Sequence, residues 1–227
     1  MLFCARNKPV PRNLTSVKID GIPIEKVNST KFLGVMIDEK LSWSLHIDYI
    51  AGKVAKTIGV ICKARKVFDR KVLRNLYFTF TYPYLIYCNS VWGLASVTHL
   101  KKLHILQKRI IRIICGAQRF SETAQLFHDL GILNIYDMNK IRLGIFSYKL
   151  CNSLLPAVFD SFHTPVSSIH DYDTRQSENL YPPGPRTEYR RNSVAYQSVL
   201  LWNSFSENIR SAETVNSFKT RLFRTLI

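Results

Sequence analysis

Acidic side chains crowd together at two places in the sequence, and such clusters are where metal-dependent chemistry could begin. Asp38-Glu39 ends a short apolar run, and Asp171-Tyr172-Asp173 lies in a polar stretch close to Arg175. Enzymes that displace phosphates with two divalent cations need several carboxylates that converge. Asp38-Glu39 suits the start of a following helix, where acids are favourable, and the second pair has no third ligand. We therefore predict no catalytic residues and no metal site in this chain.

Histidine, cysteine and serine side chains form no recognisable catalytic arrangement either. The sequence has no G-x-S-x-G, H-E-x-x-H or glycine-rich phosphate-loop motif. His99 and His104 are five residues apart, so they do not share a helix face as paired metal ligands would. His46 is expected to be a hydrogen-bonded residue at the start of a helix. The five cysteines include no C-x-x-C pair, which indicates reduced thiols in an intracellular protein, and we identify no base that would activate any of them.

Positive charge is the strongest chemical signal in the sequence. The 227 residues carry a net charge of +16, and residues 51–120 hold fourteen Lys and Arg against a single acid, Asp69. A concentrated positive field is typical of proteins that bind a polyphosphate, because each neutralised phosphate releases counterions. Charge that served only solubility would more naturally be spread over the chain.

Helical periodicity places part of this charge on a first amphipathic helix after Trp43. The apolar residues from Ile47 to Ile61 recur at helical spacing and share one face. The opposite face carries three cations, namely Lys53, Lys56 and Lys63. We predict that these cations contact nucleic acid.

A second basic helix is predicted from an N-cap at Thr98 to Gly116. Its broad apolar face suits the core of a helical bundle, and no acid occurs between Val97 and Ser121. The opposite arc of roughly 120° carries Lys101, Lys102, Lys108, Arg109 and Arg112. Because a solvated helix face normally mixes signs of charge, we predict that this arc follows a phosphate backbone. An ordinary solvated face and a helix lying on an anionic membrane are the alternatives.

The elements before these helices are predicted to be β structure. Two short strands flank Asp20-Gly21, a dipeptide suited to a tight hairpin turn. The apolar run from Lys31 to Ile37 is predicted to be one buried strand. With Leu2-Phe3-Cys4, these strands would form the edge of a sheet within residues 1–40.

The remaining chain is predicted to be helical, so the fold class is mainly α with a small N-terminal antiparallel β element (α+β). Residues 41–155 form a basic helical domain, and residues 156–227 form a loop-rich linker followed by a C-terminal helical subdomain. Tryptophans 43, 92 and 202 lie on apolar helical patterns and are expected in the core. Tyr172 and Arg175 lie in a polar loop, where an aromatic ring and a guanidinium are plausible RNA contacts.

Several segments, in order along the chain, resemble the C-terminal part of reverse transcriptases from non-LTR retrotransposons such as the Jockey, CR1 and RTE-like elements. Phe32-Leu33-Gly34-Val35 and Trp43…His46-Ile47 resemble the junction of the palm and the thumb. Tyr82-Pro83-Tyr84-Leu85 with Val91-Trp92-Gly93, and Gln107-Lys108-Arg109-Ile110-Ile111-Arg112, are similar to thumb segments. His170-x-Tyr172-x-Thr174-Arg175 and Leu201-Trp202-Asn203 resemble motifs that follow the thumb.

This resemblance implies a thumb-like helical bundle that grips RNA or an RNA–DNA template–primer duplex, with Phe32, Leu33 and Gly34 near the primer end. The aromatic-Ala-Asp-Asp motif of the family is absent from the sequence. We therefore expect a non-catalytic fragment of an RNA-directed DNA polymerase, inactive alone. Its partner would be the missing palm and fingers, and Mg²⁺ is expected only in a complete palm, so no cofactor is expected here.

Two other classes of protein stay open at this point. One is a stand-alone nucleic-acid-binding protein derived from such an element, and the other is a helical protein-interaction module whose basic face meets an acidic partner. In each case we expect a location in the nucleus or cytoplasm, no secretion, no membrane partner and no small-molecule substrate.

Overall fold

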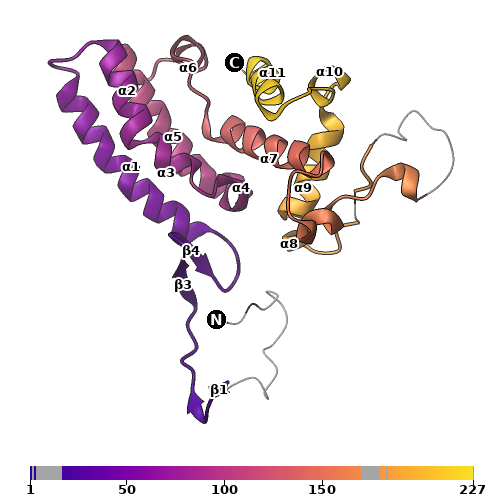
Figure 1. Ribbon diagram of the computed structural model, residues 1–227. Helices are drawn as coiled ribbons and strands as arrows, with labels where there is room; N and C mark the ends of the chain where they lie inside the picture. The colour runs from indigo at the N-terminus through magenta and orange to yellow at the C-terminus, as the bar shows by residue number, and fades with distance from the viewer. Residues whose placement is uncertain (2, 4–16, 170–178, 183, 227) are drawn as a thin grey trace.

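In the computed structural model, which describes residues 1, 3, 17–169, 179–182 and 184–226, helices make up most of the chain (Figure 1). Within these residues the paired strands lie between residues 18 and 38, and the helices follow from residue 44 onward. This arrangement confirms the predicted fold class, mainly α with a small N-terminal antiparallel β element. No helix among the described residues is long and apolar enough to cross a membrane.

The predicted first hairpin is present. β1 (Lys18–Ile19) and β2 (Ile22–Pro23) pair antiparallel, and Asp20 and Gly21 form the turn with φ angles of 50° and 82°. Asp and Gly are among the residues that tolerate this left-handed conformation. The apolar side chains of both strands are exposed. A lone two-stranded hairpin is only marginally stable in water. Because its apolar side chains are exposed, they are available to another surface.

The prediction of a single buried strand over residues 31–37 is wrong. β3 (Ser29–Phe32) and β4 (Val35–Asp38) form a second antiparallel hairpin, in which Leu33 and Gly34 make the turn at φ angles of 45° and 83°. Two successive positive φ angles are typical of the tight turns that match strand twist. The two hairpins form separate two-stranded sheets rather than the edge of one sheet. The predicted Leu2-Phe3-Cys4 strand lies largely outside the described residues.

A helical bundle follows the hairpins. The apolar face of the first helix, from Ile47 to Ile61, packs in its core against the apolar face that runs from Leu100 to Ile114. Tyr77 and Trp92 are also fully buried there. The bundle is built from α1 (Ser44–Ala64), α2 (Arg70–Phe80), α3 (Tyr82–Ile86), α4 (Asn89–Trp92), α5 (Val97–Cys115) and α6 (Ala124–Leu130).

Helices α1 and α5 lie side by side and run in the same direction (Figure 1). Near their N-terminal ends, the Lys102 ammonium lies 2.7 Å from a carboxylate oxygen of Asp48. Near their C-terminal ends, the Arg65 guanidinium lies 3.8 Å from the position that a Cβ on Gly116 would take. This parallel pairing needs the connection through α2, α3 and α4, and it brings the two basic helices predicted from the sequence together.

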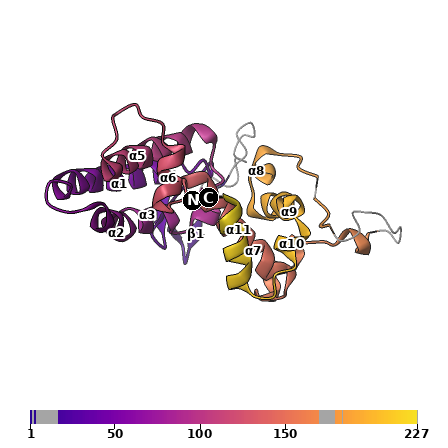
Figure 2. The ribbon, with the colours of Figure 1, turned by 90° about the horizontal axis from the view of Figure 1, so that it is seen from above.

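A second apolar cluster lies beyond the bundle. It gathers Tyr148, Val199, Trp202, Phe205 and Phe218, and Tyr148 donates a hydrogen bond to the carbonyl of Ala212. Figure 2 shows these helices beside the bundle. They are α7 (Ile135–Cys151), the 3-10 helices η2 (Ala157–Phe162) and η3 (Val166–Ser168), α8 (Glu188–Arg191), α9 (Val194–Ser204), α10 (Glu207–Arg210) and α11 (Val215–Leu226).

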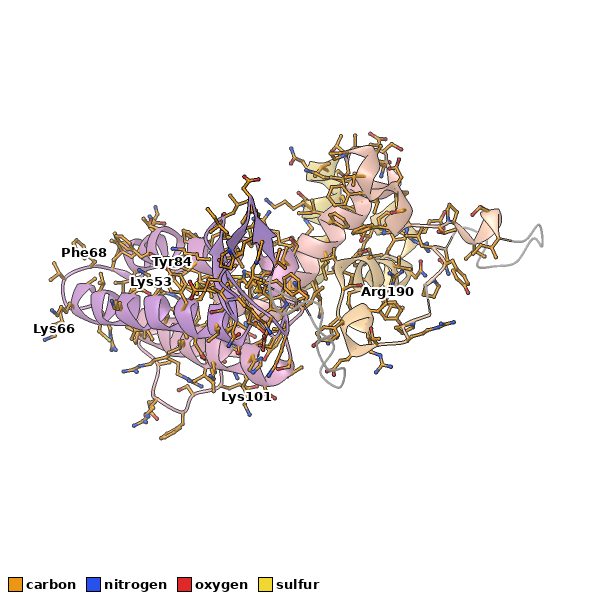
Figure 3. All side chains as sticks on the ribbon, turned by 90° about the horizontal axis from the view of Figure 1, so that it is seen from below. Lys53, Lys66, Phe68, Tyr84, Lys101 and Arg190 are labelled. Carbon is orange, nitrogen blue, oxygen red and sulfur yellow. The ribbon has the colours of Figure 1, made fainter. Side chains whose placement is uncertain are left out.

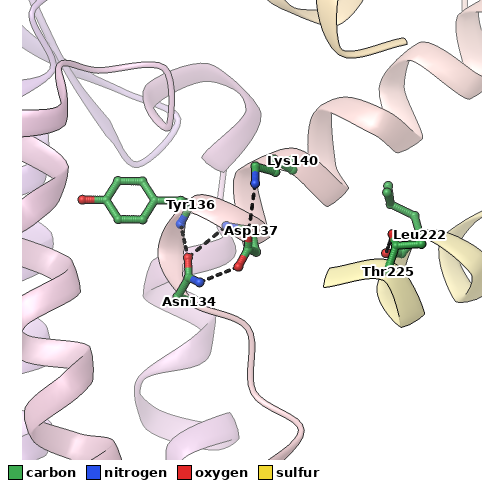
Figure 4. Close-up of polar contacts among 6 residues, drawn as sticks. All are labelled: Asn134, Tyr136, Asp137, Lys140, Leu222 and Thr225. Carbon is green, nitrogen blue, oxygen red and sulfur yellow. Dashed lines mark hydrogen bonds and ion pairs between the residues drawn. The ribbon is translucent and has the colours of Figure 1, made fainter. Parts of the chain in front are cut away.

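Helix α7 connects the two clusters, and its start is fixed by a local polar network. The side-chain oxygen of Asn134 accepts hydrogen bonds from the backbone N–H groups of Tyr136 and Asp137 (Figure 4). Lys140, one turn later, pairs with Asp137 at 3.1 Å. An N-cap of this type supplies acceptors for the otherwise unsatisfied first N–H groups of a helix. This cap fixes Ile135 as the first residue of α7, the helix that connects the bundle and the second cluster.

The cap of α5 differs from the prediction. The helix begins two residues earlier than an N-cap at Thr98 would require, because Ser96 occupies the cap position and its hydroxyl accepts from the N–H of His99. Gly116 ends the helix at a φ of 68°, as predicted. Trp92 and Trp202 are buried, and Trp43 packs on the bundle core, which confirms the expectation that the tryptophans are structural.

Candidate nucleic-acid interface

The outward sides of α1 and α5 carry the cations predicted to bind nucleic acid. Lys56, Lys63, Lys101 and Arg109 are exposed, and Lys101 projects away from the bundle (Figure 3). None of these four forms an ion pair with another described residue. We call these four residues the basic ridge. Their ammonium and guanidinium groups are available to an anionic ligand.

Lys102 lies on the same surface, but its charge is offset. Its ammonium pairs with Asp48 on α1, and both side chains are about half exposed, at 54% and 53%. The sequence did not indicate this pair, because the two residues are 54 positions apart. A phosphate that binds Lys102 would therefore compete with the Asp48 carboxylate.

Lys108 and Arg112 follow Lys101 by seven and eleven residues on the same stripe of α5, but they are half-buried. With His104 they line an open pocket of about 480 Å³ whose other walls include the 120–124 segment and α6. The Arg112 Nε donates a hydrogen bond to the carbonyl of Ser121 at 2.9 Å. Burial lowers the pKa of His104, and the nearby Lys108 lowers it further. The structure thus divides the predicted arc by exposure, since Lys101, Lys102 and Arg109 are exposed whereas Lys108 and Arg112 are half-buried.

Lys53 is half-buried and lies on the side of α1 that faces the second hairpin. Its ammonium sits 5.4 Å from the centroid of the Tyr49 ring, and Lys31 of β3 lies 5.6 Å from the same ring. Cations over an aromatic face are attracted by its quadrupole. This contact brings together Lys53, which the sequence analysis selected, and Lys31, which it did not.

Phe32, Leu33 and Gly34, predicted to be near a primer end, form the exposed tip of the second hairpin. Phe32 is 61% and Leu33 is 73% exposed. The Tyr87 hydroxyl donates a hydrogen bond of 2.6 Å to the Leu33 carbonyl, and a Cβ on Gly34 would lie 3.3 Å from the Tyr87 ring. Tyr87 therefore holds the turn against α3, and the two apolar side chains are presented to solvent.

Several carboxylates and aromatics of the sequence analysis need separate mention. Asp38 is buried and accepts hydrogen bonds from the N–H groups of Lys40, Ser42 and Trp43, which confirms a structural role before α1. Within the residues that the structure describes, no group of three His, Cys, Asp or Glu side chains could hold a metal ion. Tyr172 and Arg175, predicted RNA contacts, and the acids beside them lie outside the described residues.

His46 behaves as predicted. Its Nδ1 accepts a hydrogen bond from the N–H of Met36 at 3.3 Å. Its ring packs edge-on against Trp92, and burial lowers its pKa. The neutral imidazole therefore joins β4 to the first turn of α1, and the residue positions the hairpin.

A cysteine–histidine pair was not anticipated. Cys151 Sγ lies 3.6 Å from His163 Nδ1, and His163 Nε2 lies 3.4 Å from the hydroxyl of Ser198. Burial raises the pKa of the Cys151 thiol to about 11 and lowers that of His163 to about 4. A reactive cysteine needs a thiolate, which these shifts oppose at neutral pH. The pair is neutral, and His163 bridges Cys151 at the end of α7 and Ser198 of α9.

Further cations gather where the sequence analysis named none. Exposed basic residues lie in the α1–α2 connection, at the start of α2 and in the α5–α6 connection, namely Arg65, Lys66, Arg70, Lys71 and Arg119. All lie within the basic 51–120 segment, so the charge count included them. Helical wheels could not select them, because most lie in the connections or at helix ends and meet only in the folded bundle.

Known proteins to which this chain is similar are RNA-directed DNA polymerases of mobile elements. The chain is 30% identical over 125 residues to a probable RNA-directed DNA polymerase from the transposon X-element of Drosophila melanogaster. It is 33% identical over 126 residues to the RNA-directed DNA polymerase from the mobile element jockey of the same species, and 31% identical over 136 residues to its counterpart in Drosophila funebris.

These alignments cover between 53% and 58% of the chain but only 14% of each relative. The predicted resemblance to reverse transcriptases of non-LTR retrotransposons is thereby confirmed over about half of the chain. No protein-family model and no solved structure matches the chain.

Proposed function

We propose, from its homology to RNA-directed DNA polymerases of mobile elements, that this chain is a thumb-like part of such a polymerase that grips nucleic acid. Its ligand is RNA or an RNA–DNA template–primer duplex, bound through the phosphates by the basic ridge. In this proposal the palm of the polymerase supplies the catalytic carboxylates and the Mg²⁺ that they bind, and this part supplies only grip.

The observation that carries the proposal is the set of exposed cations on two parallel helices. The 19 residues of α5 extend about 28 Å at 1.5 Å per residue. A duplex of that length presents roughly 16 phosphates at one charge per 1.7 Å. Lys101 and Arg109 are about 12 Å apart along the helix axis by the same rise. The ridge is therefore long enough to contact several phosphates of one duplex at once.

The second hairpin supports a role beside the primer. Its exposed tip, Phe32-Leu33-Gly34, is held against α3 by Tyr87, so it is a firm apolar projection rather than a loose loop. We propose that this tip contacts the primer end, and that the exposed apolar side chains of the first hairpin dock on the palm. An isolated hairpin with such a surface gains stability from a covering partner.

Binding over a salt series tests the grip. The double variant Lys101→Gln/Arg109→Gln removes two ridge cations, and the matched control Lys219→Gln/Arg224→Gln removes two exposed cations from α11. The measurement is filter binding of a 20-base-pair RNA–DNA hybrid between 50 and 300 mM salt. Each lost phosphate contact should flatten the slope of log K against log salt by about 0.9. The ridge variant should therefore flatten it by about 1.8 and weaken binding about 60-fold at 0.1 M salt.

Two results would contradict the proposal. One is a ridge variant with the wild-type slope, and the other is a control variant that loses as much affinity as the ridge variant. Equal loss would indicate that any surface cation contributes through the net charge alone.

A further inference from the structure

Two connections meet at the end of the bundle farthest from the hairpins. One runs from Arg65 to Lys71 at the α1–α2 junction, and the other from Gly116 to Glu122 between α5 and α6. The Arg65 guanidinium lies 3.8 Å from the Cβ position on Gly116, so the two segments are neighbours. Figure 3 shows Lys66 and Phe68 at this end of the bundle. We call residues 65–71 and 116–122 the distal tip.

The distal tip exposes aromatic rings. Phe120 is 88% exposed and Phe68 is 51% exposed. A single exposed apolar residue is ordinary on a protein surface. Phe68 and Phe120 lie on the two connections that the Arg65–Gly116 contact joins, and neither ring contributes to the bundle core. Their exposure calls for a ligand that covers aromatic faces.

The charge around these rings is mainly positive, with five exposed cations against the two exposed acids Asp69 and Glu122. The single acid of the 51–120 segment, Asp69, uses its carboxylate to accept the N–H of Val72 at the start of α2. The guanidinium of Arg119 lies 5.5 Å from the centroid of the Phe120 ring. Among the described residues, none of the exposed tip cations, Arg65, Lys66, Arg70, Lys71 and Arg119, takes part in an ion pair.

We propose that the distal tip binds an unpaired segment of nucleic acid, with its bases stacked on Phe68 and Phe120 and its phosphates on the surrounding cations. Proteins that bind single strands combine a basic surface with aromatic rings that stack on successive bases. Bases inside a duplex are already stacked on each other and cannot cover a phenyl ring. The tip therefore differs in its ligand from the basic ridge, which can contact a duplex through phosphates alone.

The tip continues the ridge along the same two helices. Lys63 lies two residues before the tip on α1, and Arg109 lies about two turns before it on α5. A duplex on the ridge would thus deliver its unpaired extension to the two rings. This orientation rests on the proposed function, whereas the binding of a free single strand does not.

An anionic membrane is the other surface that basic residues and exposed aromatics can fit. We favour nucleic acid because the tip is continuous with the ridge and because the relatives of this chain are polymerases that use RNA and DNA. A membrane needs only apolar side chains at these positions, whereas stacking needs rings. Replacing both phenylalanines by leucine therefore separates the two ligands.

The experiment measures fluorescence anisotropy with two labelled probes, a 12-nucleotide single-stranded RNA and a blunt 20-base-pair RNA–DNA hybrid. The variants are Phe68→Ala/Phe120→Ala and Phe68→Leu/Phe120→Leu. The control, Leu154→Ala/Val158→Ala, removes two exposed apolar side chains far along the chain from the tip. Each lost ring should weaken single-strand binding by about 5-fold to about 150-fold. Blunt-duplex binding should change by less than about twofold, and the control should match the wild type.

Wild-type single-strand affinity in both tip variants would overturn the inference. It would also be overturned if phosphatidylserine-containing vesicles bind the wild type and the leucine variant but not the alanine variant, while RNA binding stays unchanged. Failure of the proposed function has a different signature. In that case the blunt hybrid does not bind, or binds the wild type and the ridge variant with equal affinity. The single strand still binds, and its affinity still depends on Phe68 and Phe120.

Discussion

Removing one acid should make this protein bind nucleic acid more tightly. Asp48 is the residue on α1 that holds the Lys102 ammonium at 2.7 Å on the surface beside the ridge. Asp48→Asn deletes the charge, keeps the size of the side chain, and leaves Lys102 available to a phosphate. A mutation that increases affinity is informative, because damage to the fold cannot imitate it.

The expected size follows from counterion release. One added phosphate contact should steepen the slope of log K against log salt by about 0.9, which is roughly an 8-fold gain in affinity at 0.1 M salt. The cost to the fold should be small, since exposed ion pairs contribute about 0–1 kcal/mol. For a domain of this size that is a shift in Tm of at most a few degrees.

The assay is the salt series with the 20-base-pair hybrid, and the matched control is Asp160→Asn. Asp160 is an exposed acid in η2, so this control makes the same change in net charge away from the ridge. The reasoning is refuted if both variants gain affinity equally, because net charge would then explain the effect. It is also refuted if Asp48→Asn leaves the slope of the wild type unchanged.

Two further predictions concern stability. Gln107→Leu should lower the free energy of unfolding by about 3–5 kcal/mol in urea denaturation, because it leaves the buried Tyr77 hydroxyl and two backbone groups without partners. The control Gln125→Leu, at an exposed position, should change it by less than about 0.5 kcal/mol. A loss under about 1 kcal/mol in Gln107→Leu contradicts the interpretation. Burial lowers the pKa of His163 to about 4, so the unfolded state takes up the proton first, and stability present above pH 6.5 is lost as the pH falls from 6.5 to 4. His163→Gln should reduce the slope of the free energy of unfolding against pH over this range, by at most the contribution of one bound proton. An identical pH dependence in wild type and variant would refute that sign.

The sequence was sufficient to predict the long helices, because their apolar residues are periodic and their ends are marked. The face from Ile47 to Ile61 is buried as expected, and Gly116 ends α5. Burial of a stripe depends on spacing within one helix, which a sequence displays directly. The cations opposite these stripes could be named for the same reason.

The second hairpin was missed because apolar character is a poor guide where apolar residues are exposed. Phe32 and Leu33 read as the interior of a strand, yet Leu33 takes a positive φ in the turn and both are exposed. A leucine in that conformation is unusual, so turn chemistry gave no signal apart from Gly34. The contact that holds the turn comes from Tyr87, 54 residues away.

Gln107 shows a different failure. It precedes Lys108 and Arg109 in a segment that reads as basic and solvated. In the structure it is fully buried, donates to the Tyr77 hydroxyl and the Leu133 carbonyl, and accepts from the N–H of Ile135. Polar residues on a buried face need partners, and these partners come from α2 and from the start of α7. A motif can therefore combine one buried residue that joins helices with an exposed neighbour, Arg109.

Helix electrostatics can explain the cations that precede the distal tip but not all of those within it. Positive charge in the last turn of a helix is favourable by about 0.3–1 kcal/mol, which accounts for Lys63 in α1 and Arg112 in α5. Arg70 and Lys71 are in the first turn of α2, where the same dipole makes cations unfavourable and where no acid follows the N-cap Asp69. These two residues disfavour the helix that carries them, so the stability of the fold does not explain their charge, whereas the proposed single-strand site would use it.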